Sequence, residues 1–138
     1  NSYECLLKKL DPNGKETWSV NISEGLGPNL SYGAYAVAET SDHGFVLGGT
    51  DGQFAGGKRT VAKTDAAGKV QWSLFMPGYY GYTVIRSIVE QGPDQYAAAG
   101  YQMTTSTSPH WPTIYRAYLA RIDVKPTSGA DPHTLNYH

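Results

Sequence analysis

Aromatic, amide and carboxylate side chains gather in four turn-rich segments of this sequence, residues 24–32, 50–58, 77–82 and 103–113. Aromatic planes stack on the C–H faces of sugar rings, while amides and carboxylates hydrogen-bond sugar hydroxyls. The alternative is that these rings only pack on their own strands. We predict a ligand-binding face of carbohydrate-binding type, made by Asp51, Gln53, Phe54, Tyr79, Tyr80, Tyr82, His110 and Trp111.

Patterns that indicate catalysis or a resident metal are missing from the sequence. The four histidines have no metal-ligand spacing, and Asp51-Gly52-Gln53 lies in no D-x-D-x-D-G run, although Ca²⁺ needs about six to eight oxygen ligands. No nucleophile elbow is present, and a lone Cys5 on an apolar strand is typical of a small core residue. We therefore predict no enzyme activity, no cofactor and no metal.

Charge and composition restrict the partners. The formal net charge is -1, so no basic field exists that would hold nucleic acid or an anionic membrane. No stretch approaches the roughly 20 apolar residues that span a bilayer. Charged residues make up 17% of the chain, below the ~25% typical of soluble domains, and Tyr and Gly are abundant. Together with two N-x-S sequons, at Asn21 and Asn29, this composition favours an extracellular glycoprotein.

The elements that must position this face follow from an internal repeat. The pattern D-x-x-G-K-x-x-W-S occurs at residues 11–19 and again at 65–73, an offset of 54. Residues 44–50 similarly match residues 95–101, and a third copy of the first half begins at Tyr118. Repeats of about 40 to 55 residues are typical of solenoids and propellers, in which each unit buries its faces against its neighbours.

Within each unit the apolar period is two, which predicts strands separated by turns. The expected strands are residues 3–10, 16–22, 34–39, 45–50, 60–64, 70–75, 83–90, 95–102 and 115–122. Asp-Pro-Asn-Gly and Asp-Ala-Ala-Gly predict hairpin turns in which Gly supplies the positive φ. Four antiparallel strands in about 54 residues describe a propeller blade.

Two repeated residue types have structural interpretations. Trp18 and Trp72 recur in register, and we predict that they dock between blades. Asp11 and Asp65 begin the hairpin turns, where an Asx-type hydrogen bond would cap the turn. Their repetition argues for structure, because catalytic residues need not recur in every blade.

At this point the chain resembles a known family. The D-x-x-G-x-x-x-W turn, the stretch at residues 36–50 and the recurrent K-x-D ending are similar to repeats of bacterial and archaeal extracellular β-propellers, and distantly to the tryptophan-docking blades of quinoprotein-like propellers. The resemblance covers residues 3–123 and implies an all-β propeller fold. Quinoprotein enzymes need a cofactor pocket with metal-binding acidic residues, and many use adjacent cysteines. This chain has one cysteine and no such cluster, so that activity does not carry over.

The strand count bears on function. Residues 1–123 supply about two and a half blades, and residues 124–138 are expected to be a degenerate last strand or a tail, because no Trp follows Asp123. Closed propellers usually have about four to eight blades. Three alternatives stay open: a piece of a longer propeller, a protomer that completes a ring or filament with copies of itself, and a small open sandwich.

The functional expectation follows from the unpaired strands and uncovered faces of an incomplete propeller. We expect a non-enzymatic extracellular module that self-associates or forms part of a larger propeller. The alternative is a lectin-like module that binds glycan through the aromatic face. A third interpretation is a non-catalytic section of a larger propeller enzyme.

Overall fold

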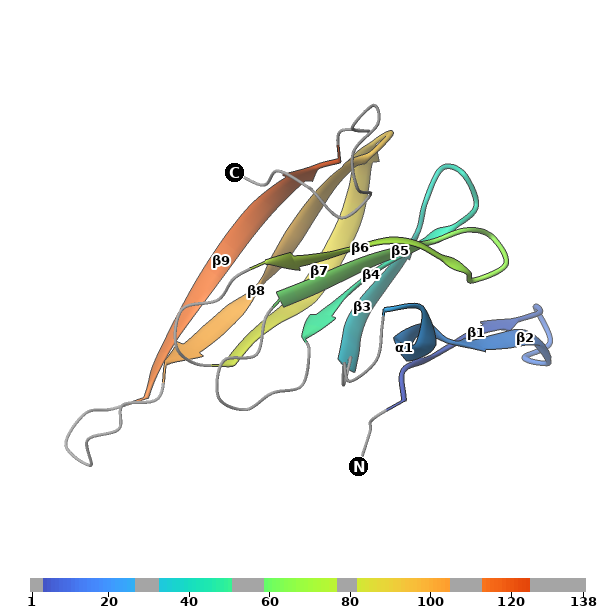
Figure 1. The fold of residues 1–138 in the computed structure, drawn as a ribbon, viewed down its shortest axis with the longest axis horizontal. Coiled ribbons are helices and arrows are strands. Elements are labelled where there is room, and N and C mark those ends of the chain that lie inside the picture. Colours follow the sequence, from blue (N-terminus) through green and yellow to red (C-terminus); the bar gives the residue numbers. More distant parts are fainter. Residues whose placement is uncertain (1–3, 27–32, 51–58, 77–81, 105–112, 125–138) are drawn as a thin grey trace.

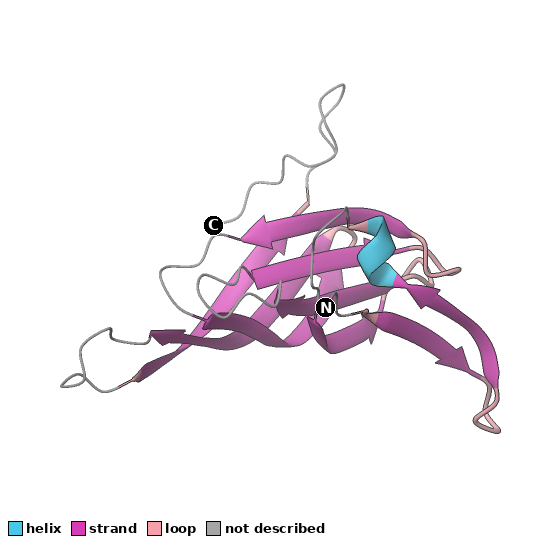
Figure 2. Cartoon of the chain, turned by 60° about the horizontal axis from the view of Figure 1, so that its bottom comes forward, coloured by secondary structure: helices cyan, strands magenta, loops and turns pink. Residues whose placement is uncertain are grey.

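Strands make up most of the described chain. The computed structural model describes residues 4–26, 33–50, 59–76, 82–104 and 113–124, and its helix is a single short turn (Figures 1 and 2). The all-β, antiparallel prediction is therefore confirmed. Residues 125–138, expected as a last strand or tail, lie outside the described residues.

Three antiparallel sheets follow one another along the chain, and each strand pairs with a neighbour in sequence. The first sheet contains β1 (Leu6–Leu10) and β2 (Glu16–Asn21). The middle sheet contains β3 (Gly33–Glu39), β4 (Phe45–Thr50), β5 (Arg59–Thr64) and β6 (Val70–Met76). The last sheet contains β7 (Tyr82–Gly92), β8 (Gln95–Thr104) and β9 (Ile114–Asp123). Each sheet has two edge strands, so no sheet within the described residues closes on itself into a barrel.

The same turn joins β1 to β2 and β5 to β6. Asp11 Oδ1 accepts hydrogen bonds from the backbone N–H groups of Asn13 and Lys15, both at 2.9 Å. Asp65 Oδ1 accepts the equivalent pair from Ala67 and Lys69, again at 2.9 Å. The glycines of the two turns have φ of 80° and 83°, a region that residues with a Cβ rarely adopt. The D-x-x-G-K repeat thus encodes one turn, made twice.

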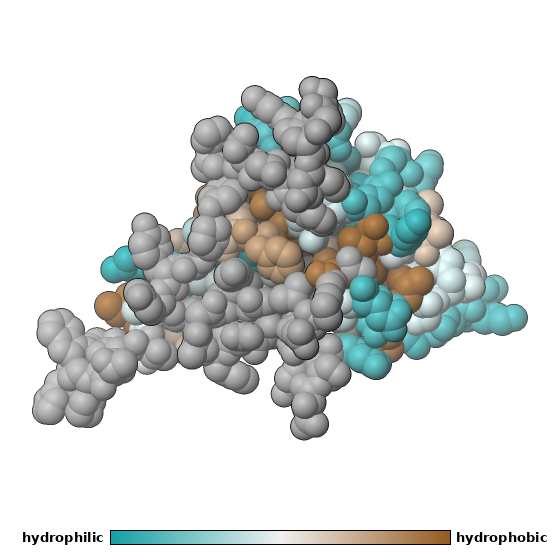
Figure 3. All heavy atoms as spheres, in the orientation of Figure 1, coloured by the Kyte–Doolittle hydropathy of each residue, from teal (hydrophilic) through white to brown (hydrophobic). Residues whose placement is uncertain are grey.

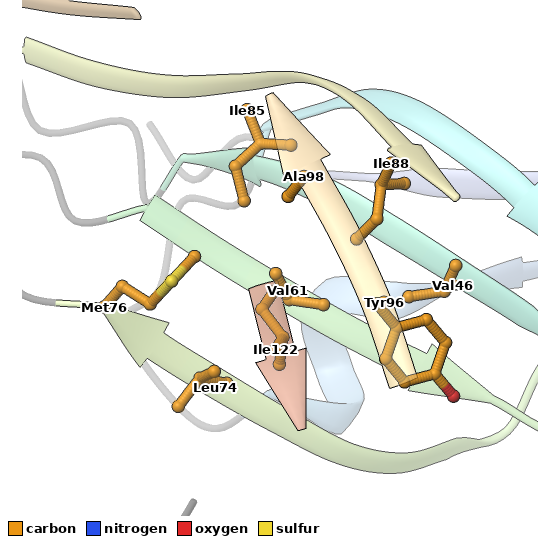
Figure 4. Close-up of a cluster of buried hydrophobic side chains, with 9 residues drawn as sticks. All are labelled: Val46, Val61, Leu74, Met76, Ile85, Ile88, Tyr96, Ala98 and Ile122. Atoms are coloured by element: carbon orange, nitrogen blue, oxygen red, sulfur yellow. The ribbon is translucent and has the colours of Figure 1, made fainter. Parts of the chain in front are cut away.

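The middle sheet lies between the other two and packs one face on each of them, while Tyr35 and Val37 on its β3 edge stay exposed. One face packs on the last sheet through a nine-residue cluster, whose side chains point into the space between the sheets in Figure 4: Val46, Val61, Leu74, Met76, Ile85, Ile88, Tyr96, Ala98 and Ile122. The other face packs on the first sheet and on α1 (Ile22–Gly25) through Cys5, Ile22, Leu26, Leu47 and Ala62. Burial of these apolar side chains is what holds the stack together.

Two β-bulges interrupt the alternation at equivalent places in the middle and last sheets. The register shifts between Ala34 and Ala36 in β3 and between Ile85 and Ser87 in β7. The partner strands carry Gly49 and Gly100 beside these bulges, where an added Cβ would overlap the Gly33 and Val84 carbonyl groups. A bulge bends its strand and displaces the extra residue from the alternating pattern. Tyr35 and Arg86 are these extra residues.

The strand predictions agree with the structure to within one or two residues, except that β1 begins at Leu6 and not at residue 3, and the end of β2 has a local cause. The sequence pattern predicts a strand to Ile22, but β2 ends at Asn21 and α1 follows. The Asn21 side chain caps this helix by accepting a hydrogen bond from the Ser23 N–H at 3.1 Å. Capping by Asn favours a helix start over continued strand, which is why the strand stops here.

Candidate functional site

Of the eight predicted ligand-binding residues, one belongs to the described part of the chain. Tyr82 is described, at the start of β7, whereas the other seven lie outside the described residues: Asp51, Gln53, Phe54, Tyr79, Tyr80, His110 and Trp111. The strand ends that flank these segments are paired with one another, as in Thr50 with Arg59 and Thr104 with Ile114. These strand ends of the middle and last sheets lie on one side of the molecule, toward the lower left of Figure 1.

Tyr82 belongs to a cluster that sequence reasoning did not find, which we call the tyrosine–arginine cluster: Tyr35, Tyr82, Arg86, Tyr101 and Tyr115. The Tyr82 and Tyr35 hydroxyl oxygens lie 3.0 Å apart, within hydrogen-bond distance. The Arg86 guanidinium lies 4.6 Å from the Tyr35 ring centroid and 5.5 Å from that of Tyr101. Arg86 Nη2 also donates to the Tyr101 hydroxyl at 3.3 Å, and the Tyr101 and Tyr115 ring centroids are 6.0 Å apart.

The β-bulges bring this cluster together. Tyr35 and Arg86 are the bulged residues of two edge strands that lie side by side, β3 and β7. Without the bulges, neither side chain would depart from the alternation of its strand. The only sequence signal was a bulky residue within segments otherwise rich in small and β-branched residues, which by itself does not identify a bulge.

Two side chains of the cluster, Tyr82 and Arg86, have shifted pKa values. Burial raises the pKa of Tyr82 well above its ordinary value, and the hydrogen bond with Tyr35 raises it further. The hydrogen bond with the Tyr101 hydroxyl raises the pKa of Arg86. Within the described ranges, no carboxylate forms an ion pair with Arg86. The cluster therefore presents one positive charge beside the hydroxyl groups of its tyrosines.

Both repeated tryptophans contact an aromatic ring on the next sheet. Trp18 on β2 meets Phe45 on β4 edge-to-face, with ring centroids 5.8 Å apart. Trp72 on β6 meets Tyr96 on β8 in the same way, at 5.7 Å. Phe45 and Tyr96 are themselves matched by the internal repeat. The two junctions between sheets thus contain equivalent aromatic pairs, each made by a repeated tryptophan and a ring on the next sheet.

The outer face of the last sheet is uncovered in the described part of the chain, and we call it the trailing face. Cross-strand register places its side chains together: Val89, Ala97, Ala99, Tyr101, Tyr115, Ala117, Leu119 and Arg121. Leu119 is 80% exposed and Tyr115 is 66% exposed. Large apolar side chains exposed together on one sheet face are typical of an interaction surface.

The first sheet has an uncovered outer face of its own, the leading face, formed by Leu6, Lys8 and Leu10 of β1. Leu6 is 53% exposed and Leu10 is 55% exposed. Figure 3 shows hydrophobic surface around α1 and the adjoining start of β1. An open groove of about 270 Å³ also runs between β1 and β3, with Leu6 and Val37 among its lining residues. The β1 edge beside it has no strand partner in the described chain.

The Asn21 side chain of the first sequon makes hydrogen bonds within this fold. Asn21 Oδ1 caps α1, and its Nδ2, the atom that a glycan would modify, donates to Glu24 Oε1 at 3.3 Å. The Ser23 hydroxyl accepts from the Cys5 N–H at 3.1 Å. These contacts account for both residues without a glycan. Asn29 lies outside the described residues.

The described ranges hold no cluster of three or more His, Cys, Asp or Glu side chains that could bind a metal ion. Burial raises the pKa of the Cys5 thiol, which disfavours the nucleophilic thiolate. Nor does the described chain contain a helix of the length and apolarity needed to cross a membrane. Comparison with protein-family models and with curated proteins finds no match for this chain.

Proposed function

We propose that this chain is a non-enzymatic, extracellular structural module that self-associates head to tail, with the trailing face of one copy packing on the leading face of the next. The observation that carries this proposal is the equivalence between the trailing face and a face that is already covered within the chain. The low charge content and the abundance of Tyr and Gly support an extracellular setting.

The equivalence follows from the repeat. Leu119 stands four residues before Asp123, as Val61 stands four residues before Asp65. Val61 is fully buried because the last sheet covers it, whereas Leu119 is 80% exposed. Ala97 likewise corresponds to Val46, which lies in the core between the middle and last sheets. A surface of this kind suits another sheet of the same repeat.

The leading face offers such a sheet. Leu6 and Leu10 correspond to Thr60 and Thr64, both buried on the middle sheet, and Leu10 also to Ile122, buried on the last sheet. In each of those sheets the matching residues point toward the preceding sheet. A second copy therefore supplies a suitable occupant for the trailing face. Different surfaces meet in such a contact, so it is heterologous and gives a ring or a filament.

The propeller architecture is part of this proposal. The repeated turns and repeated aromatic junctions support a row of propeller blades. The four-stranded middle sheet would be a whole blade, and the two-stranded and three-stranded sheets would be partial blades on either side of it. Further repeats of a longer polypeptide would cover the same two faces as a second copy. The two versions differ in whether the 138-residue chain associates by itself.

Light scattering coupled to size exclusion tests the proposal, with intact mass spectrometry to detect glycans. We expect multiples of 15.0 kDa, discrete for a ring and open-ended for a filament. Leu119→Lys should return the chain to a monomer without loss of folding, because the side chain is exposed. Ala66→Lys, which adds the same charge at an exposed turn, is the control and should assemble normally. A wild-type monomer at every concentration would overturn self-association.

The tyrosine–arginine cluster favours a second candidate function, glycan binding. It places aromatic rings and hydroxyl groups together beside the strand ends that flank the predicted aromatic segments. A glycan array with the wild-type chain tests this candidate. Loss of the signal in Tyr80→Ala or Trp111→Ala would assign those segments to the site, and loss in Tyr115→Ala would assign the cluster.

A further inference from the structure

We propose that the tyrosine–arginine cluster binds an acidic sugar, with Arg86 holding the carboxylate of a uronic-acid residue and the tyrosines contacting its ring and hydroxyl groups. This inference rests on the second candidate function, glycan binding, and it names the class of glycan.

Arg86 is held in position before any ligand arrives. Its guanidinium lies against the Tyr35 ring at 4.6 Å and the Tyr101 ring at 5.5 Å. Stacking on aromatic rings restricts a long side chain that would otherwise lose rotamer entropy on binding. A fixed guanidinium matches a carboxylate in the bidentate geometry that Arg favours.

The charge of Arg86 is uncompensated within the described residues. None of the ion pairs there includes it, and its Nη2 donates a hydrogen bond to the Tyr101 hydroxyl. Other basic side chains do have acidic partners, as Lys8 does with Glu16 at 2.8 Å and Arg121 with Asp123 at 3.2 Å. Arg86 is thus a cation held by aromatic rings, a setting that favours an anionic ligand.

The tyrosines supply the remaining groups that a sugar requires. Tyr115 is 66% exposed beside Tyr101, so its ring is accessible to the C–H face of a pyranose. The Tyr35 and Tyr82 hydroxyl oxygens lie 3.0 Å apart, and Tyr82 stays protonated because burial and this hydrogen bond raise its pKa. Neutral hydroxyl groups can exchange hydrogen bonds with sugar hydroxyls without repelling a carboxylate.

A single cation also argues for a sugar acid over a nucleic acid. Nucleic-acid binding draws its affinity from several phosphate contacts, and the net charge of this chain is -1. One carboxylate and one guanidinium make a local pair that needs no basic field. An oligonucleotide is therefore included below as a competing probe.

Calorimetric titration with an oligogalacturonate tests the proposal, with the methyl-esterified oligomer as a matched ligand that lacks the charge. We expect the acid to bind about tenfold or more tightly than the ester. Arg86→Gln should remove this difference, and Arg86→Lys should recover only part of it, because Lys lacks the planar fork. Arg121→Gln removes a positive charge elsewhere on the last sheet and should bind as the wild type does.

The outcomes separate the two levels of the proposal. Equal affinity for acid and ester, or binding unchanged in Arg86→Gln, overturns the acidic-sugar inference. If neutral oligosaccharides bind the wild type as tightly as the acid does, and this binding is lost in Tyr115→Ala, glycan binding is supported and the acidic-sugar inference fails. Binding to no oligosaccharide overturns both, and tighter binding of a single-stranded oligonucleotide would replace the sugar as ligand. Thermal unfolding of each variant checks that it folds. If Arg86→Gln does not fold, Tyr115→Ala is the variant that tests whether the acid binds at the cluster.

Discussion

At the scale of single residues, the Lys63–Asp42 pair shows how the fold accommodates a buried charge. The Lys63 side chain is 4% exposed, and its Nζ donates to Asp42 Oδ2 at 2.8 Å, to the Thr64 carbonyl at 2.7 Å and to Gln71 Oε1 at 3.3 Å. Burying an ammonium group is costly unless such partners surround it. The hydrogen bond from Lys63 holds the pKa of Asp42 well below its ordinary value.

Asp42→Asn should therefore make the chain less stable at neutral pH. Asp42 is 53% exposed, so solvent screens the pair, and we expect a loss of about 1–2 kcal/mol in the free energy of unfolding. Because the folded pKa lies below the unfolded value, the contribution is present above about pH 4 and declines as the pH falls further. Urea unfolding at pH 7 and pH 3 measures both effects.

The control for this prediction is Glu16→Gln, which removes the carboxylate of the half-exposed Lys8–Glu16 pair. An exposed pair of this kind contributes about 0–1 kcal/mol, so this variant should change little. If Asp42→Asn keeps wild-type stability at pH 7, the pair does not stabilise the fold.

At the scale of elements, the bulges of β3 and β7 are the features that distinguish this fold from a plain alternating sheet. Each is matched by a glycine on the partner strand, and each displaces a large side chain that joins the tyrosine–arginine cluster. The two sheets thus have the same backbone bulge at equivalent positions, but the bulged residue is Tyr35 in the middle sheet and Arg86 in the last sheet. We attribute the difference in surface chemistry between the sheets to this change.

Gly49→Ala should destabilise the middle sheet. An added Cβ would overlap the Gly33 carbonyl group, which belongs to the backbone and cannot rotate away. We expect a loss of about 2–3 kcal/mol, as for other overpacked sites, measured by thermal unfolding.

Gly92→Ala provides the comparison, since its Cβ would meet only the Gln95 side-chain oxygen at 3.6 Å. Its stability should stay within about 0.5 kcal/mol of the wild type. Equal melting temperatures for the two variants would contradict the role assigned to Gly49.

At the scale of the whole molecule, the exposed apolar side chains lie mainly toward the two ends of the stack. Leu6 and Leu10 belong to β1, and Ile114, Tyr115 and Leu119 belong to β9. The leading and trailing faces have different residues, so the proposed contact joins unlike surfaces. Tyr115 is shared by the trailing face and the tyrosine–arginine cluster, so ligand binding and assembly would compete at that end.

A mixing experiment tests the head-to-tail geometry. Leu6→Lys blocks the leading face and Leu119→Lys blocks the trailing face, so each variant alone should be monomeric. Mixed in equal amounts, they should form a heterodimer that cannot extend, because one intact face of each kind remains. Light scattering measures the mass of the mixture. Isologous pairing predicts instead that one of the two variants alone still dimerises.

The sequence by itself determined the local structure of this protein. Alternating apolar residues, the Asp-x-x-Gly turns and the repeat predicted all nine described strands, with most ends within one or two residues and the largest difference at β1, which begins at Leu6. The capping hydrogen bonds of Asp11 and Asp65 depend on backbone groups two and four residues away, so nearby sequence suffices to predict them.

The tertiary structure alone decided which surfaces and side chains come together. A one-residue bulge reverses the facing of a strand, and the alternating pattern does not reveal where that reversal falls. The meeting of Tyr35 with Arg86 therefore depended on the packing of β3 against β7, 51 positions apart in the repeat. The exposure of Leu119, against the burial of the equivalent Val61, was likewise set by what lies over each sheet and not by the residue itself.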